Sequence, residues 1–193
     1  MEGIKELTAQ CDKSQIKGIS FGGQMHGLVV LDEKDQIIRP AILWNDGRTG
    51  KQTDYLNQEI GKETLSRYTG NIAFAGFTAP KILWMREKEP ENFARIGRIM
   101  LPKDYLAFYL SGEFSTDYSD ASGTLLLDVE HKCWSEEMME ICGVRESQLP
   151  KLYESWEPTG IIKPEIAEEL GIPQNVKIIA GAGDNAAAAV GTG

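Results

Sequence analysis

Asp184 and Asn185 place a carboxylate directly beside a carboxamide, a pairing that suits chemistry on a hydroxyl group. They follow Gly181 and Gly183, at the point where an apolar run gives way to a run of alanines. In phosphoryl transfer an aspartate accepts the proton of the attacking hydroxyl group, and a carboxamide can hold the same substrate through its donor and acceptor atoms. The pairing therefore makes Asp184 a candidate general base and Asn185 a candidate substrate ligand.

Two other interpretations of Asp184 are open from the local sequence. Aspartate is a preferred N-cap residue, so Asp184 could do no more than start a helix. The pattern Gly181-x-Gly183-x-x-Ala186 also fits a dinucleotide-binding fingerprint. That fit is weak, because a carboxylate at this position would face the pyrophosphate that a helix N-terminus attracts. Catalysis and helix capping are supported equally well by the local sequence.

A second candidate site is the pair Met25 and His26, in a glycine-bounded turn at residues 22–27. Histidine can donate and accept hydrogen bonds to sugar hydroxyl groups, and methionine can pack on a ring or a carbon chain. The neighbouring glycines would let a ligand approach the backbone closely. Taken alone, however, a turn histidine that is satisfied by its own surroundings is the commoner case.

Two polar loops add weaker candidates. The first brings the carboxylate of Asp46 close to the guanidinium of Arg48, a combination that suits a polyol, although an ordinary turn explains it as well. The second contains a further set of polar residues that is equally ambiguous: Asp117, Tyr118, Ser119, Asp120 and Ser122.

The elements that must position these groups alternate between strands and helices, which predicts an α/β fold. The corner around Asp184 is expected to be a short buried strand, a tight glycine turn and a helix packed close to its neighbours. Thr78 is expected to cap the helix that follows it. Strands are expected at residues 16–21, 28–31, 36–39, 98–101, 125–129 and 176–180, with the second and third forming a hairpin. Helices are expected at 1–11, 63–68, 78–85, 90–96, 102–110, 135–141 and 164–170, with another ending near 61 and irregular chain at 116–124 and 149–164.

The composition limits the function classes. A net charge of −9 over 193 residues leaves no basic stripe for nonspecific nucleic-acid binding. No apolar run is long enough to predict a membrane span. The three cysteines show no C-x-x-C spacing and are interpreted as reduced thiols, which favours a cytoplasmic protein. The two histidines are far apart in a sequence with no zinc-ligand spacing, so no metal site is predicted.

Six motifs, taken together and in this order, resemble the FGGY carbohydrate kinases, and among them the xylulokinases. Each motif alone is weak, but together they extend over nearly the whole chain. They lie at residues 18–27, 39–48, 76–84, 101–105, 116–124 and 181–186, and the last reads Gly-Ala-Gly-Asp-Asn-Ala.

The resemblance implies an actin-like, ribonuclease H-like fold in which two domains close on a cleft. It implies phosphorylation of D-xylulose to D-xylulose 5-phosphate, with ATP and Mg²⁺. By the same resemblance Asp184 matches the catalytic base, and Met25, His26 and Asn185 match sugar-binding residues. Four further residues fall in loops that line the sugar pocket in some members: Asp46, Arg48, Asp117 and Tyr118.

The resemblance also implies that residues 1–193 are the N-terminal, sugar-binding domain of a longer kinase. The family's opening Asp-x-Gly-Thr phosphate loop and its C-terminal ATP-binding domain have no counterpart in the sequence. We therefore expect the chain alone to be inactive and most ATP contacts to lie outside it. A kinase of ribulose, gluconate, glycerol or fuculose, and a sugar-binding module without catalysis, remain alternatives. A homodimer remains open.

Overall fold

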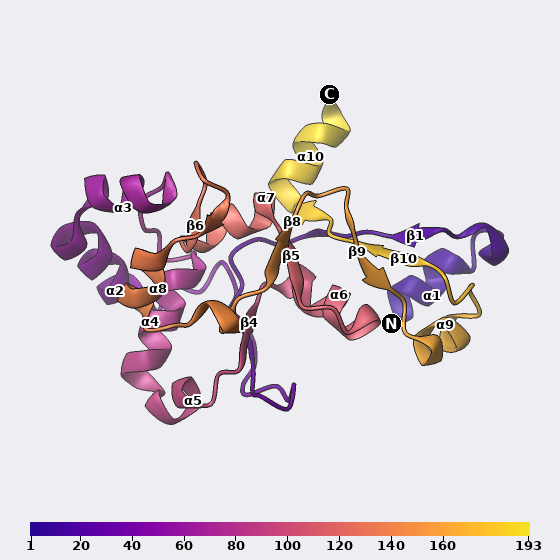
Figure 1. The fold of residues 1–193 in the computed structure, drawn as a ribbon, viewed down its shortest axis with the longest axis horizontal. Coiled ribbons are helices and arrows are strands. Elements are labelled where there is room, and N and C mark those ends of the chain that lie inside the picture. Colours follow the sequence, from indigo (N-terminus) through magenta and orange to yellow (C-terminus); the bar gives the residue numbers. More distant parts are fainter.

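The computed structural model describes residues 1–193 and is elongated, with a helical lobe, a sheet lobe and a narrower middle (Figure 1). The helical lobe is at the left of Figure 1, the sheet lobe is at the right, and the C-terminal helix projects from the middle. The lobes have separate cores, of 21 and nine buried apolar residues. The α/β class is therefore confirmed.

The sheet lobe is built on three strands in the order β1–β10–β9. β1 (Gly18–Ile19) runs parallel to β10 (Lys177–Ile179), and β9 (Pro158–Ile161) is antiparallel to β10. Beyond the sheet, the segments that follow β1 and β10 stay side by side, because β2 (Gly22–Gly23) pairs in parallel with β11 (Ala182–Gly183). The helices of this lobe are α1 (Glu2–Thr8), α6 (Pro102–Ser111) and α9 (Pro164–Leu170).

The helical lobe contains most of the larger core. Its first helix, α2, continues directly into a π-helical segment, Tyr55–Gly61. The elements are α2 (Gly50–Asp54), α3 (Lys62–Thr69), α4 (Thr78–Lys88), α5 (Pro90–Ala94), α8 (Glu136–Cys142) and the antiparallel pair β6 (Leu127–Asp128) and β7 (Cys133–Trp134). None of the helices in the chain is long and apolar enough to cross a lipid bilayer.

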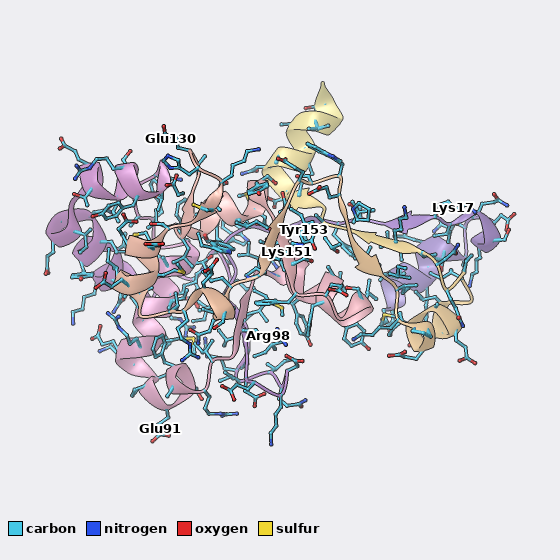
Figure 2. All side chains as sticks on the ribbon, viewed as in Figure 1. Lys17, Glu91, Arg98, Glu130, Lys151 and Tyr153 are labelled. Atoms are coloured by element: carbon cyan, nitrogen blue, oxygen red, sulfur yellow. The ribbon has the colours of Figure 1, made fainter.

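The middle joins the lobes through two short strand pairs. β3 (Val29–Leu31) is antiparallel to β4 (Arg98–Met100), and β5 (Ser115–Asp117) is parallel to β8 (Lys151–Tyr153). Helix α7 (Tyr118–Ala121) follows β5, and α10 (Asp184–Thr192) follows β11. Figure 2 shows Lys151 and Tyr153 of β8 near the centre of the view, whereas Lys17, Glu91 and Glu130 lie at the periphery.

Local sequence explains the ends of several helices. α6 and α9 begin with proline, whose missing N–H group costs nothing in the first helical turn. Both end at a glycine in the left-handed conformation, Gly112 and Gly171. α8 begins after Ser135, whose hydroxyl accepts a hydrogen bond from the N–H of Met138. These helices lie where the sequence predicts them.

Three predictions of regular structure were wrong. Residues 116–124 are not a loop, because they contain the end of β5 and helix α7, and residues 149–164 are not irregular, because they contain β8 and β9. Thr78 does not cap α4, since Phe77 is the residue before the helix and makes no side-chain cap. The Thr78 hydroxyl instead donates to the carbonyl oxygen of His26, 3.2 Å away.

Two further expectations were only partly right. Residues 36–39 return towards β3 through isolated bridges, such as Leu31 to Ile37, and β3 takes β4 as its ladder partner instead. The alanine-rich helix α10 forms as predicted but is not packed into the protein, since none of its residues is buried. Only its first turn meets the body, where Ala187 lies against Gly22.

Candidate functional site

The corner that carries Asp184 forms because a glycine, Gly181, lies between strands β10 and β11. Gly181 has φ +75°, and a Cβ atom at this position would overlap the carbonyl oxygen of Phe21. The chain then pairs with β2 and enters α10 at Asp184. The carboxylate is therefore delivered next to the loop that follows β2.

Met25 from that loop fills the space between two glycines. A Cβ atom on Gly183 would lie 2.9 Å from the Cγ atom of Met25 and 3.0 Å from its sulfur, and one on Gly123 would lie 2.9 Å from its Cε atom. These distances are shorter than van der Waals contact, so Met25 can occupy this space only because residues 123 and 183 have no side chain. The residue immediately before Asp184 thus lies against Met25.

His26 is held in an unusual conformation. Its φ angle is +70°, in the left-handed region that non-glycine residues rarely adopt. Its ring stacks on Phe77 with the centroids 4.5 Å apart, and its Nδ1 atom lies 2.8 Å from the carbonyl oxygen of Gly123. Because a carbonyl oxygen can only accept, the proton is on Nδ1. Nε2 has no partner within the chain and is not sealed from solvent.

The surroundings keep the imidazole uncharged. Burial lowers the pKa of His26 and the hydrogen bond to Gly123 opposes this, while the charge of Lys81 lowers the pKa and that of Asp184 raises it. The net result is a pKa below the usual value, so His26 is neutral at pH 7. The influence of Asp184 also means that its carboxylate lies within electrostatic range of the ring.

Lys81 lies beneath His26 and has no exposed surface. Its Nζ atom donates to the carbonyl oxygens of His26, at 2.7 Å, and of Gly76, at 2.5 Å. Burial lowers the pKa of Lys81 to about 8, against an opposing effect of Asp46. Helix α4, which carries Lys81, therefore anchors the His26 turn directly.

The loop that contains Asp46 and Arg48 lies against Gly76 and helix α4. The Arg48 guanidinium binds the Asp46 carboxylate through two hydrogen bonds, of 2.9 and 2.7 Å, and lies 4.7 Å above the ring of Trp84. These bonds lower the pKa of Asp46. The carbonyl of Trp44 lies close against Gly76, the residue whose own carbonyl binds Lys81.

A second buried lysine, Lys103, lies beneath the aspartate corner. Its Nζ atom is 2.8 Å from Asp104, 3.1 Å from Asp117 and 3.9 Å from Asp120, and all four side chains are at most 1% exposed. Burial acts to lower the pKa of Lys103, but the three carboxylates offset this and hold it above its usual value. Nζ also donates to the carbonyl oxygen of Ala180, the residue directly after β10.

Asp120 is the carboxylate that this cluster leaves without a hydrogen bond. Neither of its oxygens has a partner. Burial, followed by the charges of Asp104, Asp117 and Asp184, raises its pKa to about 8, against the attraction of Lys103. One ammonium cannot neutralise three buried carboxylates, so Asp120 keeps its proton at neutral pH.

The predicted site residues therefore fall into two groups. Met25, His26 and Asp184 come together, and the exposed Asn185 follows with its backbone N–H 2.9 Å from the Asp184 Oδ1 atom. Asp117 has no exposed surface and binds Lys103 and the hydroxyls of Ser119 and Ser155, so it supports the site from beneath. Tyr118 has its ring 5.0 Å from the Lys132 ammonium.

Sequence reasoning missed Lys81 and Lys103, and it left Asp120 among the ambiguous polar residues of its loop. One signal was available for Lys81, because it directly precedes Ile82 and Leu83 on a helix that was expected to face the core. For Lys103 the only sign is its position next to Asp104. Nothing in the sequence separates Asp120 from the neighbouring polar residues.

The chain offers no metal centre at this site. No three histidine, cysteine, aspartate or glutamate side chains converge as metal ligands. A surface pocket of about 410 Å³ lies on α2 and α4, lined by Lys51, Gln52 and Glu87 among others, and none of its lining residues belongs to the site. Asp184 and Asn185 are exposed at the start of α10, so the site can be reached from solvent.

Known proteins resemble this chain in sequence along almost its whole length. The sequence model of the FGGY family of carbohydrate kinases, N-terminal domain, matches residues 1–191. The chain is 52% identical to the xylulose kinase of Lactococcus lactis over 179 residues, which are 93% of this chain and 36% of that protein.

Two solved structures have similar folds. The ligand-bound xylulose kinase of Lactobacillus acidophilus matches with a TM-score of 0.91 and 30% identity over 98% of this chain and 39% of that one. The gluconate kinase of the same organism matches with a TM-score of 0.88 and 30% identity over 94% and 37%. The chain therefore spans less than two fifths of the length of each of these proteins.

Proposed function

Because the chain belongs to the FGGY family of carbohydrate kinases, we propose that it is the sugar-binding part of a kinase. The kinase transfers a phosphoryl group from ATP to D-xylulose and gives D-xylulose 5-phosphate. Support comes from the xylulose kinases among the similar proteins, and from the N-terminal domain that residues 1–191 match. The ATP-binding domain is proposed to lie in the remainder of a longer protein.

The observation that carries the proposal is the contact between Gly183 and Met25. These residues are far apart in the sequence, yet their packing sets the carboxylate of Asp184 beside the turn that presents His26. This packing supports the proposal, because it brings a carboxylate next to two groups that are suited to a sugar.

Asp184 acts as the general base. Its Oδ1 atom accepts the N–H of Asn185, which leaves Oδ2 to take the proton of the sugar hydroxyl as the oxygen is phosphorylated. Met25 packs on the carbon chain of the sugar, and His26 and Asn185 bind its hydroxyl groups. Asp46, Arg48 and Tyr118 border the same sugar, and Asp117 supports it through Lys103.

ATP supplies the phosphoryl group, and Mg²⁺ would balance the charge of its phosphates. The residues of this chain do not fit a Mg²⁺ site, because Lys103 already occupies the centre of the aspartate cluster. Both lysines beneath the site are buried and bound to carbonyl oxygens, so neither is free to bind a phosphate. Binding of ATP and Mg²⁺ is therefore proposed to need residues outside this chain, and the chain alone is proposed to be inactive.

Two assays test this function. Titration of the chain with D-xylulose, followed by amide NMR, is expected to shift resonances of the loop around Met25 and of the first turn of α10. A chimaera, in which this chain replaces the matching part of the Lactococcus lactis xylulose kinase, is expected to consume ATP only when xylulose is present. A chimaera that folds but does not turn over xylulose would contradict the proposal.

Asp184→Asn in the chimaera tests whether Asp184 is the general base. We expect turnover to fall by about 10²- to 10⁴-fold, with xylulose binding retained. Asp54→Asn is the matched control, since Asp54 is an exposed helical aspartate outside the site. Near-normal turnover of the Asp184 variant would remove this residue from the role of base.

A kinase of another polyol is the second candidate, favoured by the match to a gluconate kinase at the same identity as to a xylulose kinase. Xylulose, ribulose, gluconate, glycerol and fuculose offered to the chimaera separate these options. Light scattering on the chain tests the proposed homodimer at the same time.

A further inference from the structure

Lys81 is buried in a way that needs an explanation. Its side chain has no exposed surface, and no carboxylate forms an ion pair with it, since Asp46 acts on it only at longer range. Burial of an ammonium group without a paired anion is strongly unfavourable. A helix residue that served only the core would be replaced by an apolar side chain at lower cost.

The two hydrogen-bond acceptors of Lys81 show what its burial achieves. They are the carbonyl oxygens of His26 and Gly76, and the carbonyl of His26 also accepts the hydroxyl of Thr78. Two donors from the first turns of α4 thus hold one carbonyl, at the residue whose backbone is in the left-handed region. A strained backbone of this kind persists only where its surroundings hold it.

We propose that Lys81 is a positioning residue for the sugar-binding site, and that His26, so positioned, accepts a hydrogen bond from a substrate hydroxyl through Nε2. The second half rests on the proposed function for its ligand. The first half concerns contacts inside the chain alone.

The geometry fixes the role of each ring nitrogen. Nδ1–H donates to the carbonyl of Gly123, and the stack on Phe77 prevents the ring from turning over freely. Nε2 therefore carries a lone pair and faces no partner in the chain. The cation of Lys81 disfavours a second proton on the ring, while the carboxylate of Asp184 favours it. A ligand group at Nε2 must then donate a hydrogen bond, which selects a hydroxyl over a carboxylate at that position.

The first experiment observes the ring directly in the 193-residue chain. Nitrogen-15 NMR of the imidazoles distinguishes the two tautomers, and His131→Gln removes the only other histidine, which is exposed. We expect a single Nδ1–H tautomer for His26. In Lys81→Met we expect a mixture of tautomers, and a pKa of His26 that is higher than in the wild type because a nearby positive charge is gone.

A second variant tests the same role if Lys81→Met does not fold, and a third is a control. Thr78→Val removes the weaker donor to the same carbonyl and is expected to move the ring resonances in the same direction by a smaller amount. Lys88→Met is the matched control, because Lys88 is on the same helix with its side chain 52% exposed, and it is expected to change nothing. Unchanged ring shifts in Lys81→Met, or in Thr78→Val where Lys81→Met does not fold, would overturn the positioning role.

The second experiment adds D-xylulose to the same samples. We expect the Nε2 resonance to move with the Nδ1–H tautomer retained, and Lys81→Met to bind about tenfold more weakly. Protonation of His26, or a switch to the Nε2–H tautomer on binding, would overturn the acceptor role. If the wild type shows no xylulose-dependent change anywhere, the proposed substrate fails, and the variants still decide the role of Lys81.

Discussion

Gly123→Ala is the sharpest test of how the site is packed. A Cβ atom at this position would lie 2.5 Å from both Cε1 and Nδ1 of His26, and 2.9 Å from Cε of Met25. Ordinary contact between such atoms begins at about 3.5 Å, so the ring must move by roughly 1 Å. The stack on Phe77 restricts that movement. The movement would also break the hydrogen bond from Nδ1 to the carbonyl of residue 123.

The magnitude follows from these contacts. Loss of the hydrogen bond costs about 1 kcal/mol, and forced repacking adds about 1–3 kcal/mol. Gly123 does not have a positive φ angle, so alanine is not strained there and returns up to about 1 kcal/mol by restricting the unfolded chain. We therefore expect a net loss of about 1–4 kcal/mol in the free energy of unfolding.

Urea denaturation of the chain measures this loss, and xylulose titration measures the accompanying fall in affinity. Gly50→Ala is the control, because a Cβ atom on Gly50 meets nothing within 4 Å and its φ angle is not positive either. A Gly123→Ala protein with wild-type stability and unchanged His26 resonances would refute the packing argument. Equal losses in both variants would assign the effect to glycine replacement in general.

Three further predictions follow from other buried groups. Asp120→Asn should stabilise the chain by up to about 4 kcal/mol at pH 7. The raised pKa of Asp120 means that the wild type loses stability as pH rises from about 4 towards 8, so urea titrations should show the gain vanish near pH 4. A thiol reagent should label Cys11 and Cys133 in the native chain but not Cys142, whose burial raises its pKa to about 12, until urea is added. Gly181→Ala should cost more than about 3 kcal/mol or prevent folding, as circular dichroism would reveal, because φ +75° and the Phe21 carbonyl both oppose a side chain.

The predictable elements of this fold are those whose signals are local. α6, α8 and α9 have their start and stop residues within a few positions of their ends, so the sequence predicts them well. β5 could not be predicted in this way. It consists of Ser115, Thr116 and Asp117, and a polar triplet normally indicates a loop, yet all three are buried. They can be buried because β8 pairs with them and Lys103 meets the aspartate, and both partners are remote or hidden in the sequence.

The site residues differ in the same way, since only some of them have a signal in the sequence. Met25, His26 and Asp184 were expected because glycine-rich turns and a motif resemblance mark them, and their meeting depends on one parallel pairing of β2 with β11. Lys81 and Lys103 were not expected, since a lysine on a helix is normally exposed. Only the assembled packing shows that α4 and α6 turn these side chains inward.

The two buried lysines have a common arrangement that accounts for the precision of the site. Lys81 binds the carbonyl of His26, on one of the segments that meet at Met25, and Lys103 binds the carbonyl of Ala180, on the other. A Cβ atom on Gly23 would lie 2.5 Å from that of Lys103, so β2 is packed directly onto the second lysine. Each half of the surface is thus tied by a buried cation to a helix of a different lobe, α4 or α6. Because neither cation can leave its carbonyl without losing its hydrogen bonds in a place that water does not reach, the two halves keep a fixed relation to each other even though Asp184 and Asn185 are exposed.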